Sequence, residues 1–284
     1  MGAIFRHELR NYFHSLTAYV FGAFLLAVVG LGSVLYNLQA AVSNFEFVLS
    51  FASIIFVVIV PILTMRTLAE ERRQRTDQLL YSLPITTTQV VLGKYLALLV
   101  VYLIPLAVIS LYPLLFSQFG DVYLPTSYGS LFAFFMMGAA LLAVGMFLSS
   151  LTDNQGFAAG IGIAAILLNY YSVSLAEYTS STAMGSLIAL YVIALLLGVV
   201  IRGLTRNENL AYGVTFALIA ALSVAYFVNS TAFEGLLPDI MTKLSLFRQF
   251  NSFVNGAFDL TAIVYYVSVM GFFLFLSVQS MEKR

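Results

Sequence analysis

Few residues of this chain are of types that carry out chemistry. Cysteine is absent, and only two histidines occur. His7 and His14 could face one way on a helix and share a metal ion, but no third ligand lies near them on that face. The only Gly-Lys pair, Gly93 and Lys94, lacks the first glycine and the final Ser or Thr of a phosphate-binding loop. Neither H-E-x-x-H nor G-x-S-x-G occurs, so we expect no catalytic, cofactor or metal site here.

The composition predicts an integral membrane protein. Hydrophobic residues make up 61% of the 284 residues and charged residues only 9%, whereas soluble domains have about a quarter charged residues. The formal net charge is zero, so no basic surface is available to hold nucleic acid. We therefore expect the lipid bilayer to be the main surroundings of the chain.

The gaps between charged residues predict about eight transmembrane helices, because a charge at the bilayer centre costs about 2.5 to 3.5 kcal/mol. Each gap approaches the roughly 20 residues needed to cross the hydrocarbon. The expected fold is an all-α polytopic membrane protein with a single transmembrane domain over residues 1–284. The predicted helix cores are 17–38, 47–66, 88–117, 129–150, 156–176, 184–201, 209–229 and 259–280.

The positions of lysine and arginine predict that both termini are cytoplasmic. If each helix crosses once, the inner side holds eleven basic residues and the outer side holds only Lys243 and Arg248. The eleven are Arg6, Arg10, Arg66, Arg72, Arg73, Arg75, Lys94, Arg202, Arg206, Lys283 and Arg284. Lys94 lies within two turns of the inner side, where we expect its side chain to snorkel to the membrane surface.

Residues 1–16 predict an amphipathic helix in the membrane interface. Its apolar face at helical spacing consists of Phe5, Leu9, Tyr12, Phe13 and Leu16. The residues expected to face away are Arg6, His7, Glu8, Arg10, Asn11 and His14.

The sizeable inner loop, residues 66–94, predicts a helix on the membrane surface over residues 70–83. Glu70 with Arg73 and Glu71 with Arg75 are spaced for ion pairs on one face. The other face carries Leu79, Leu80 and Leu83, and Pro84 ends the helix. Thr86 and Gln89 form a capping box that starts the next helix. A generic positively charged loop has the same composition, and composition alone does not decide between the two.

This loop resembles the coupling-helix signature of ATP-binding-cassette (ABC) exporter permeases, E-(E/K/R)-(K/R)-x-G-T-x-E-x-L-L-x-x-P followed by G-K and an aromatic residue. Arg75 and Gln78 depart from it, in place of the usual glycine and glutamate. The variant R-T-D-Q-L-L is similar to the permeases of gliding-motility and nitrous-oxide-reductase maturation systems. The matching positions are Glu71, Arg72, Arg73, Thr76, Leu80, Pro84, Gly93, Lys94 and Tyr95.

Two further stretches resemble the same family. Residues 148–155 are similar to its S-S-L-(T/S)-(D/E)-(N/S)-Q turn. The C-terminal part, from Phe247 through Tyr265 and Tyr266 to Arg284, follows the pattern of the family's last external segment and last span. The resemblance therefore covers nearly the whole chain.

The resemblance implies a permease subunit of an ABC exporter in a bacterial plasma membrane, with an unidentified substrate. It implies two ATP-binding subunits, which would hold ATP and Mg²⁺, and a second permease that is identical or homologous. The residues it assigns to ATPase coupling are Glu71, Arg72, Arg73, Thr76, Leu79, Leu80, Leu83 and Pro84. Two alternatives remain open: an ion-coupled secondary transporter, and a non-transporting scaffold or force-transmitting subunit.

Two other groups are candidate functional residues. Asn169, Tyr170 and Tyr171 form a polar cluster within a span, which could line a pathway or bond a neighbouring helix. In the external segment, residues 230–258, Phe247, Phe250 and Phe253 recur at helical spacing. They could form an external gate, or the apolar side of a helix in the outer membrane interface.

Overall fold

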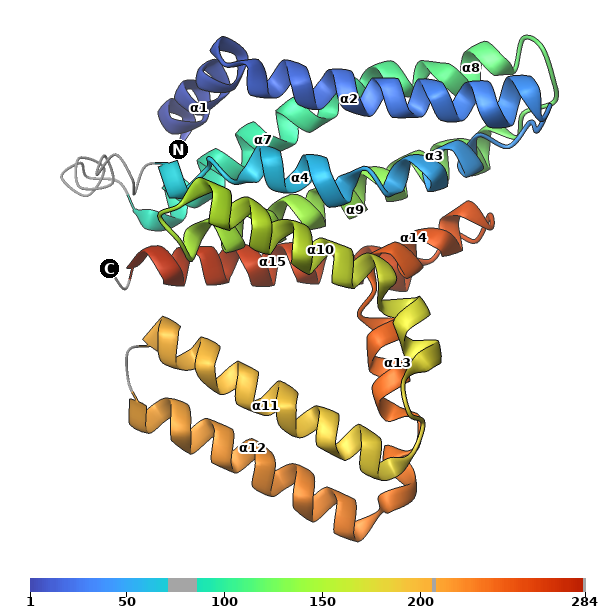
Figure 1. Cartoon of the computed structure of the whole chain (residues 1–284). Helices are drawn as coiled ribbons and strands as arrows, with labels where there is room; N and C mark the ends of the chain where they lie inside the picture. Colours follow the sequence, from blue (N-terminus) through green and yellow to red (C-terminus); the bar gives the residue numbers. More distant parts are fainter. Residues whose placement is uncertain (71–85, 206–207, 283–284) are drawn as a thin grey trace. The chain divides into compact units, whose positions relative to one another are not determined.

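The computed structural model describes residues 1–70, 86–205 and 208–282, and within these ranges the chain is helical with no strand. The prediction of an all-α fold is confirmed. The chain divides into two compact units, which we describe separately. Unit 1 contains Met1–Tyr170 and Gln249–Glu282, and unit 2 contains Tyr171–Arg248 (Figure 1).

Each predicted transmembrane core falls on a helix or a pair of helices. Six helical segments of the described residues are long and apolar enough to cross a membrane, or seven with α3 and α4, which are bent by 57° at their junction. The six are Leu16–Gln39 (α2, Leu16–Gly32, and η1, Ser33–Gln39), Thr87–Phe116 (α7, Thr87–Ile109, and α8, Leu111–Phe116), Leu124–Ser150 (α9), Gln155–Tyr178 (α10), Glu208–Val228 (α12) and Leu260–Glu282 (α15). The bent pair is α3 (Phe45–Ser53) and α4 (Phe56–Thr64), and the remaining predicted core falls on α11 (Ala183–Thr205), whose apolar section is Ala183–Val199.

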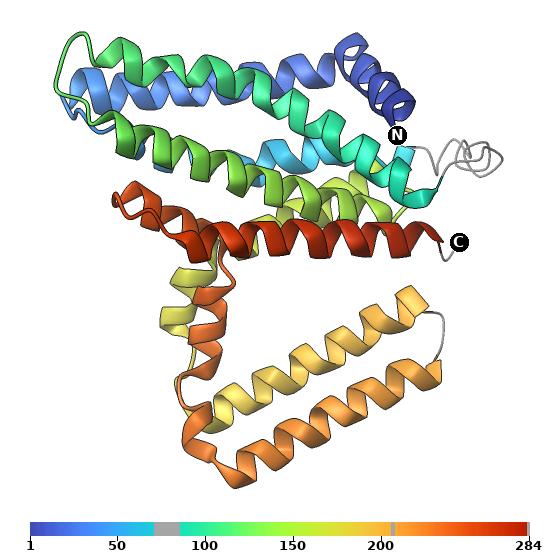
Figure 2. The same ribbon diagram turned by 180° about the vertical axis from the view of Figure 1, so that it is seen from behind.

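Helix α9 is the central helix of unit 1. Of its most apolar window, 83% of the residues are buried, and α3, α4, α7 and α15 all pack against it (Figures 1 and 2). Two tyrosines of α7 bond to its carbonyls: the Tyr95 hydroxyl donates to the Ala139 oxygen at 3.0 Å, and the Tyr102 hydroxyl to the Phe134 oxygen at 2.8 Å. Gly138 is required here, because a Cβ at this position would lie 2.5 Å from the Tyr102 Cζ.

Unit 2 is built on an antiparallel pair of helices, α11 and α12. The Tyr191 and Ser223 hydroxyls are hydrogen-bonded at 2.6 Å across the pair. At the turn between the two helices, Arg202 forms an exposed ion pair with Glu208. Many large apolar side chains of this pair are exposed, as expected of helices whose surroundings are lipid.

The external segment is helical as predicted, but Phe247, Phe250 and Phe253 are buried in the protein. It comprises η2 (Ser230–Phe233), α13 (Leu236–Lys243) and α14 (Leu246–Val254). Phe247 is buried, and Phe250 and Phe253 of unit 1 are only 1% and 2% exposed. The Phe250 ring stands edge-on to Phe134 of α9, with centroids 5.8 Å apart. The interfacial interpretation is therefore wrong for Phe250, because the aromatic core of unit 1 buries it.

Candidate functional site

The residues that the resemblance assigns to ATPase coupling lie outside the described residues. Glu71, Arg72, Arg73, Thr76, Leu79, Leu80, Leu83 and Pro84 all fall between positions 71 and 85. We call residues 71–85 the coupling segment. It joins the described chain at two points, Glu70, which follows α4, and Thr86, which directly precedes α7. The end of α4 and the start of α7 lie at one end of unit 1 (Figure 1). We call the set of contacts around these two points the loop frame, and we build the candidate site from it.

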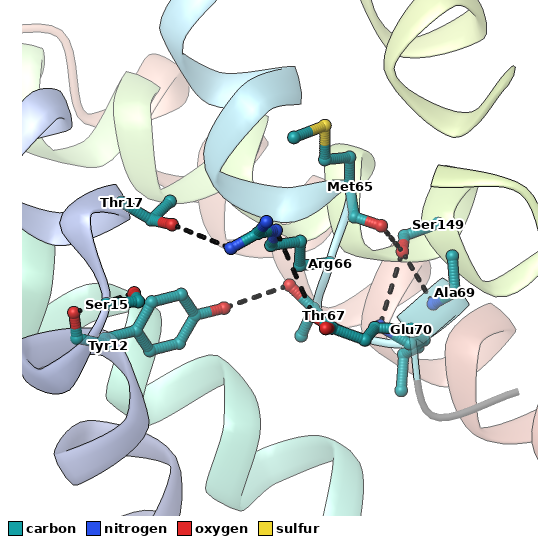
Figure 3. A network of polar contacts seen from close by, with 10 residues as sticks. Tyr12, Ser15, Thr17, Met65, Arg66, Thr67, Ala69, Glu70 and Ser149 are labelled. Carbon is teal, nitrogen blue, oxygen red and sulfur yellow. Dashed lines mark hydrogen bonds and ion pairs between the residues drawn. The ribbon is translucent and has the colours of Figure 1, made fainter. Parts of the chain in front are cut away.

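Ser149, at the end of α9, holds the first attachment point (Figure 3). Its Oγ donates to the Met65 carbonyl at 3.1 Å and accepts from the Leu68 and Ala69 amides at 3.3 and 3.2 Å. Helix α4 ends at Thr64, so the peptide groups that follow need partners outside that helix. One buried hydroxyl supplies three of these bonds, and the chain leading to Glu70 is thereby fixed to α9.

The junction of α1 (Gly2–His14) and α2 also contacts the first attachment point (Figure 3). The Tyr12 and Thr67 hydroxyls lie 3.2 Å apart, and Arg66 donates to the Thr17 hydroxyl at 3.4 Å. Arg66 also approaches Glu70 at 4.0 Å, but both side chains are more than a third exposed, so this pair contributes little to stability. The buried Tyr12 contact is therefore the main link from α1.

The second attachment point is the start of α7. The Thr86 hydroxyl accepts from the Gln89 amide at 3.3 Å, which confirms the predicted cap. Next to it, the Thr87 hydroxyl donates to a Glu282 carboxylate oxygen at 2.7 Å. The Ser280 hydroxyl of the same helix, α15, donates to the Ser150 carbonyl at 3.2 Å. The last turn of α15 thus contacts both α7 and the end of α9.

Three consecutive residues of the family signature, Gly93, Lys94 and Tyr95, contact three different partners. A Cβ at Gly93 would lie 3.1 Å from the Ile4 Cγ2, so glycine lets α1 lie close against α7. The Lys94 Nζ donates to a Glu8 carboxylate oxygen of α1 at 2.8 Å, and these side chains are 2% and 13% exposed. Tyr95 bonds to α9, as described above. These three residues therefore connect α7 to α1 and to α9.

Helix α1 therefore contacts the chain on both sides of the coupling segment, Thr67 before it and α7 after it. Glu8 and Tyr12, one turn apart, bond to Lys94 on one side and to Thr67 on the other. Two predictions are wrong here: Glu8 does not face away from the protein, and Lys94 does not extend to the surface. A buried ammonium needs a paired carboxylate, and Glu8 supplies it from a position 86 residues away in sequence. No local pattern indicates that pairing.

The family-like turn at residues 148–155 contains Ser149, which belongs to the loop frame, and leads into α10. The Asn154 side-chain oxygen accepts from the Gly156 amide at 2.9 Å and from the Phe157 amide at 3.3 Å. These bonds satisfy free amides in the first turn of α10. The turn motif thus contributes Ser149 and Ser150 to the loop frame and also supplies the cap of α10.

The remaining candidate residues do not belong to the loop frame. Asn169, Tyr170 and Tyr171 are consecutive on α10; the first two are half-buried and Tyr171 is exposed. Their role stays a prediction, as does the gating role of the external phenylalanines. His14 bonds to the Arg10 carbonyl at 2.8 Å, and the part of the chain that the structure describes contains no group of three residues able to hold a metal ion.

Comparison with known families gives one match. Residues 31–184, more than half of the chain, match the family described as ABC-2 family transporter protein. The matched region begins near the end of α2 and reaches the start of α11, so it includes the coupling segment, both of its attachment points and the turn at 148–155. No curated protein matches the chain.

Proposed function

Because the chain belongs to the ABC-2 family of transporter proteins, whose members are membrane transport components, we propose that it is the permease subunit of an ABC exporter. ATP and Mg²⁺ would be bound by two copies of a separate ATP-binding subunit, and a second permease, identical or homologous, would complete the assembly. The resemblance of residues 75–80 to the permeases of gliding-motility and nitrous-oxide-reductase maturation systems is the finer part of this proposal. The observation that supports the permease assignment is the family match over residues 31–184, which include both ends of the coupling segment.

In this proposal the coupling segment receives movement from the ATP-binding subunits. Each of its ends joins a helix of unit 1. Residues 65–70 connect it to α4, and α7 follows it directly. The loop frame holds these ends against α1, α9 and α15 by the bonds described above. A displacement of the segment would therefore move several spans together and change which side of the membrane they leave open.

Two alternatives predict different behaviour. A secondary transporter would move its substrate without an ATPase and would need an ionisable group within the membrane. Lys94 is bonded to Glu8, whereas Glu46 is 2% exposed and one of its oxygens has no hydrogen-bond partner among the described residues. That alternative therefore predicts that Glu46→Gln abolishes transport. A scaffold would bind the ATPase but move no substrate.

Purification of the tagged chain from its native membrane tests the proposal. We expect a subunit with a phosphate-binding loop to co-purify, and the purified complex to hydrolyse ATP. Purification of the chain without such a subunit, or substrate movement by the chain alone, would contradict the proposal.

The proposed topology makes a direct prediction, because the chain has no cysteine of its own. Both termini are proposed to be cytoplasmic in a bacterial plasma membrane, from the eleven-to-two distribution of basic residues. In intact cells, an impermeant thiol reagent should label Asp121→Cys, Ser180→Cys and Lys243→Cys. Asp153→Cys should be labelled only after the membrane is opened. Labelling of Asp153→Cys from outside would overturn this topology.

A further inference from the structure

Three buried serines of α9 direct their hydroxyls away from their own helix. A serine within a helix commonly donates to a carbonyl one turn earlier. Ser277 does so with Phe273 and Ser33 with Val29, at 2.8 and 2.9 Å. Ser127, Ser130 and Ser149 instead bond to other elements. They lie at the two ends of α9, where neighbouring elements could be moved relative to it.

At the end of α9 remote from the loop frame, two serines hold α3 and α14. The Ser127 hydroxyl donates to a Glu46 carboxylate oxygen of α3 at 3.1 Å. The Ser130 hydroxyl donates to the Phe253 carbonyl of α14 at 2.9 Å. One turn further along α9 is Phe134, which contacts the Phe250 ring of α14. Helix α14 is thus attached to α9 by a hydrogen bond and an aromatic contact.

The contacts at both ends lie on one side of α9. At 100° per residue, the side chains of Ser127, Ser130, Phe134 and Ser149 fall within an arc of about 100°. Gly145 lies on the same side and packs against Thr64 of α4. With a rise of about 1.5 Å per residue, Ser130 and Ser149 are about 28 Å apart along the helix axis. One continuous side of α9 therefore contacts the loop frame through Ser149 and α14 through Ser130.

Helix α9 is built to move as one body. Its one proline is in the first turn, where proline does not kink a helix. Its interior is closely packed, with Gly138 against Tyr102 and Gly145 against Thr64, and neither glycine leaves room for a Cβ. Closely packed helices shift as units rather than deforming continuously. A movement at Ser149 would therefore reach Ser130.

We propose that α9 transmits the movement of the coupling segment to the external helix α14, with Ser149 as its input contact and Ser130 as its output contact. This inference rests on the proposed function. It assigns positioning roles to Ser127 and Ser130, which lie outside the sequence motifs, and to Ser149, which lies in the turn motif at residues 148–155. Ser127 supports the output by fixing α3 beside it through Glu46. Substrate release on the outer side would then follow the position of α14.

A cysteine reporter on α14 tests this transmission. Ser252→Cys, half-buried on α14, is introduced into the chain and purified with the ATPase that co-purifies with it, then placed in lipid vesicles. Its labelling rate by an impermeant maleimide is measured with ATP and vanadate and without nucleotide. We expect a several-fold change with nucleotide. In the background of Ser127→Ala with Ser130→Ala, the nucleotide-dependent change should disappear, while the amount of bound ATPase stays unchanged.

Ser277→Ala is the matched control, because it removes a buried serine hydroxyl that bonds only within α15. It should keep the full nucleotide-dependent change. The proposal is overturned if the double variant keeps that change, or if the reporter in the otherwise unchanged chain does not respond to nucleotide. Absence of a co-purifying ATPase would overturn the proposed function as well, so the two failures are distinguishable.

Discussion

Replacing Leu79 and Leu80 together by aspartate should abolish co-purification of the ATP-binding subunit while leaving expression and membrane insertion intact. If these leucines are buried in a groove of that subunit, each substitution removes apolar burial of roughly 1.5 to 3 kcal/mol and places a carboxylate where it loses water. Binding should weaken by about a hundredfold or more. The measurement is the amount of ATPase retained on the tagged chain, together with ATP hydrolysis by the purified sample.

Arg202→Ala is the control for this experiment. Arg202 lies at the turn between α11 and α12, where its exposed ion pair with Glu208 contributes little to stability. It should retain the ATPase at the level of the unchanged chain. If the double leucine variant retains the ATPase normally, residues 70–83 are not the coupling element. That outcome would favour the alternative of an ordinary positively charged loop.

Glu8→Ala should detach α1 from the loop frame. The change leaves the Lys94 ammonium buried, with 2% of its side chain exposed, and removes the Glu8 carboxylate that it bonds. Removing one partner of a buried ion pair costs about 3 to 5 kcal/mol, and separation of α1 from α7 would relieve that cost by admitting water. The free energy of unfolding in detergent should fall, and the amides of residues 2–14 should exchange hydrogen faster.

A second substitution separates charge from packing. Adding Lys94→Met to Glu8→Ala removes the buried ammonium, so most of the lost stability should return. Arg6→Ala, on the exposed side of α1, should change the unfolding free energy by less than about 0.5 kcal/mol. If Glu8→Ala alone changes the unfolding free energy as little as Arg6→Ala does, the contact of α1 with α7 does not stabilise the loop frame.

The elements of the fold that local patterns determine were predictable from the sequence. Charge-free stretches place the spans, because lipid excludes charge wherever the stretch occurs in the chain. The start of α7 is determined by Thr86 and Gln89, which are three residues apart, and the structure confirms it. The apolar face of the N-terminal helix is partly local as well, and Tyr12 is buried as that pattern predicts.

Contacts between distant residues could not be predicted in this way. Glu8 was assigned to a polar face by helical spacing, since the position of its partner Lys94 depends on how α1 packs on α7. Phe250 has the spacing expected of an interfacial helix, and only the position of Phe134 shows that it is buried in the protein. Ser127 and Ser130 of α9 carry no local signal, because serine is common in membrane helices and its partner is set by tertiary structure.

Photo-crosslinking from position 80 tests the central claim most directly. A photoreactive amino acid replaces Leu80 in the tagged chain, with a second variant carrying it at Arg202, and both are irradiated in native membranes. The account predicts a covalent adduct with an ATP-binding subunit from position 80 and none from position 202. An adduct with lipid alone from position 80, in membranes where the ATPase is present, would contradict it.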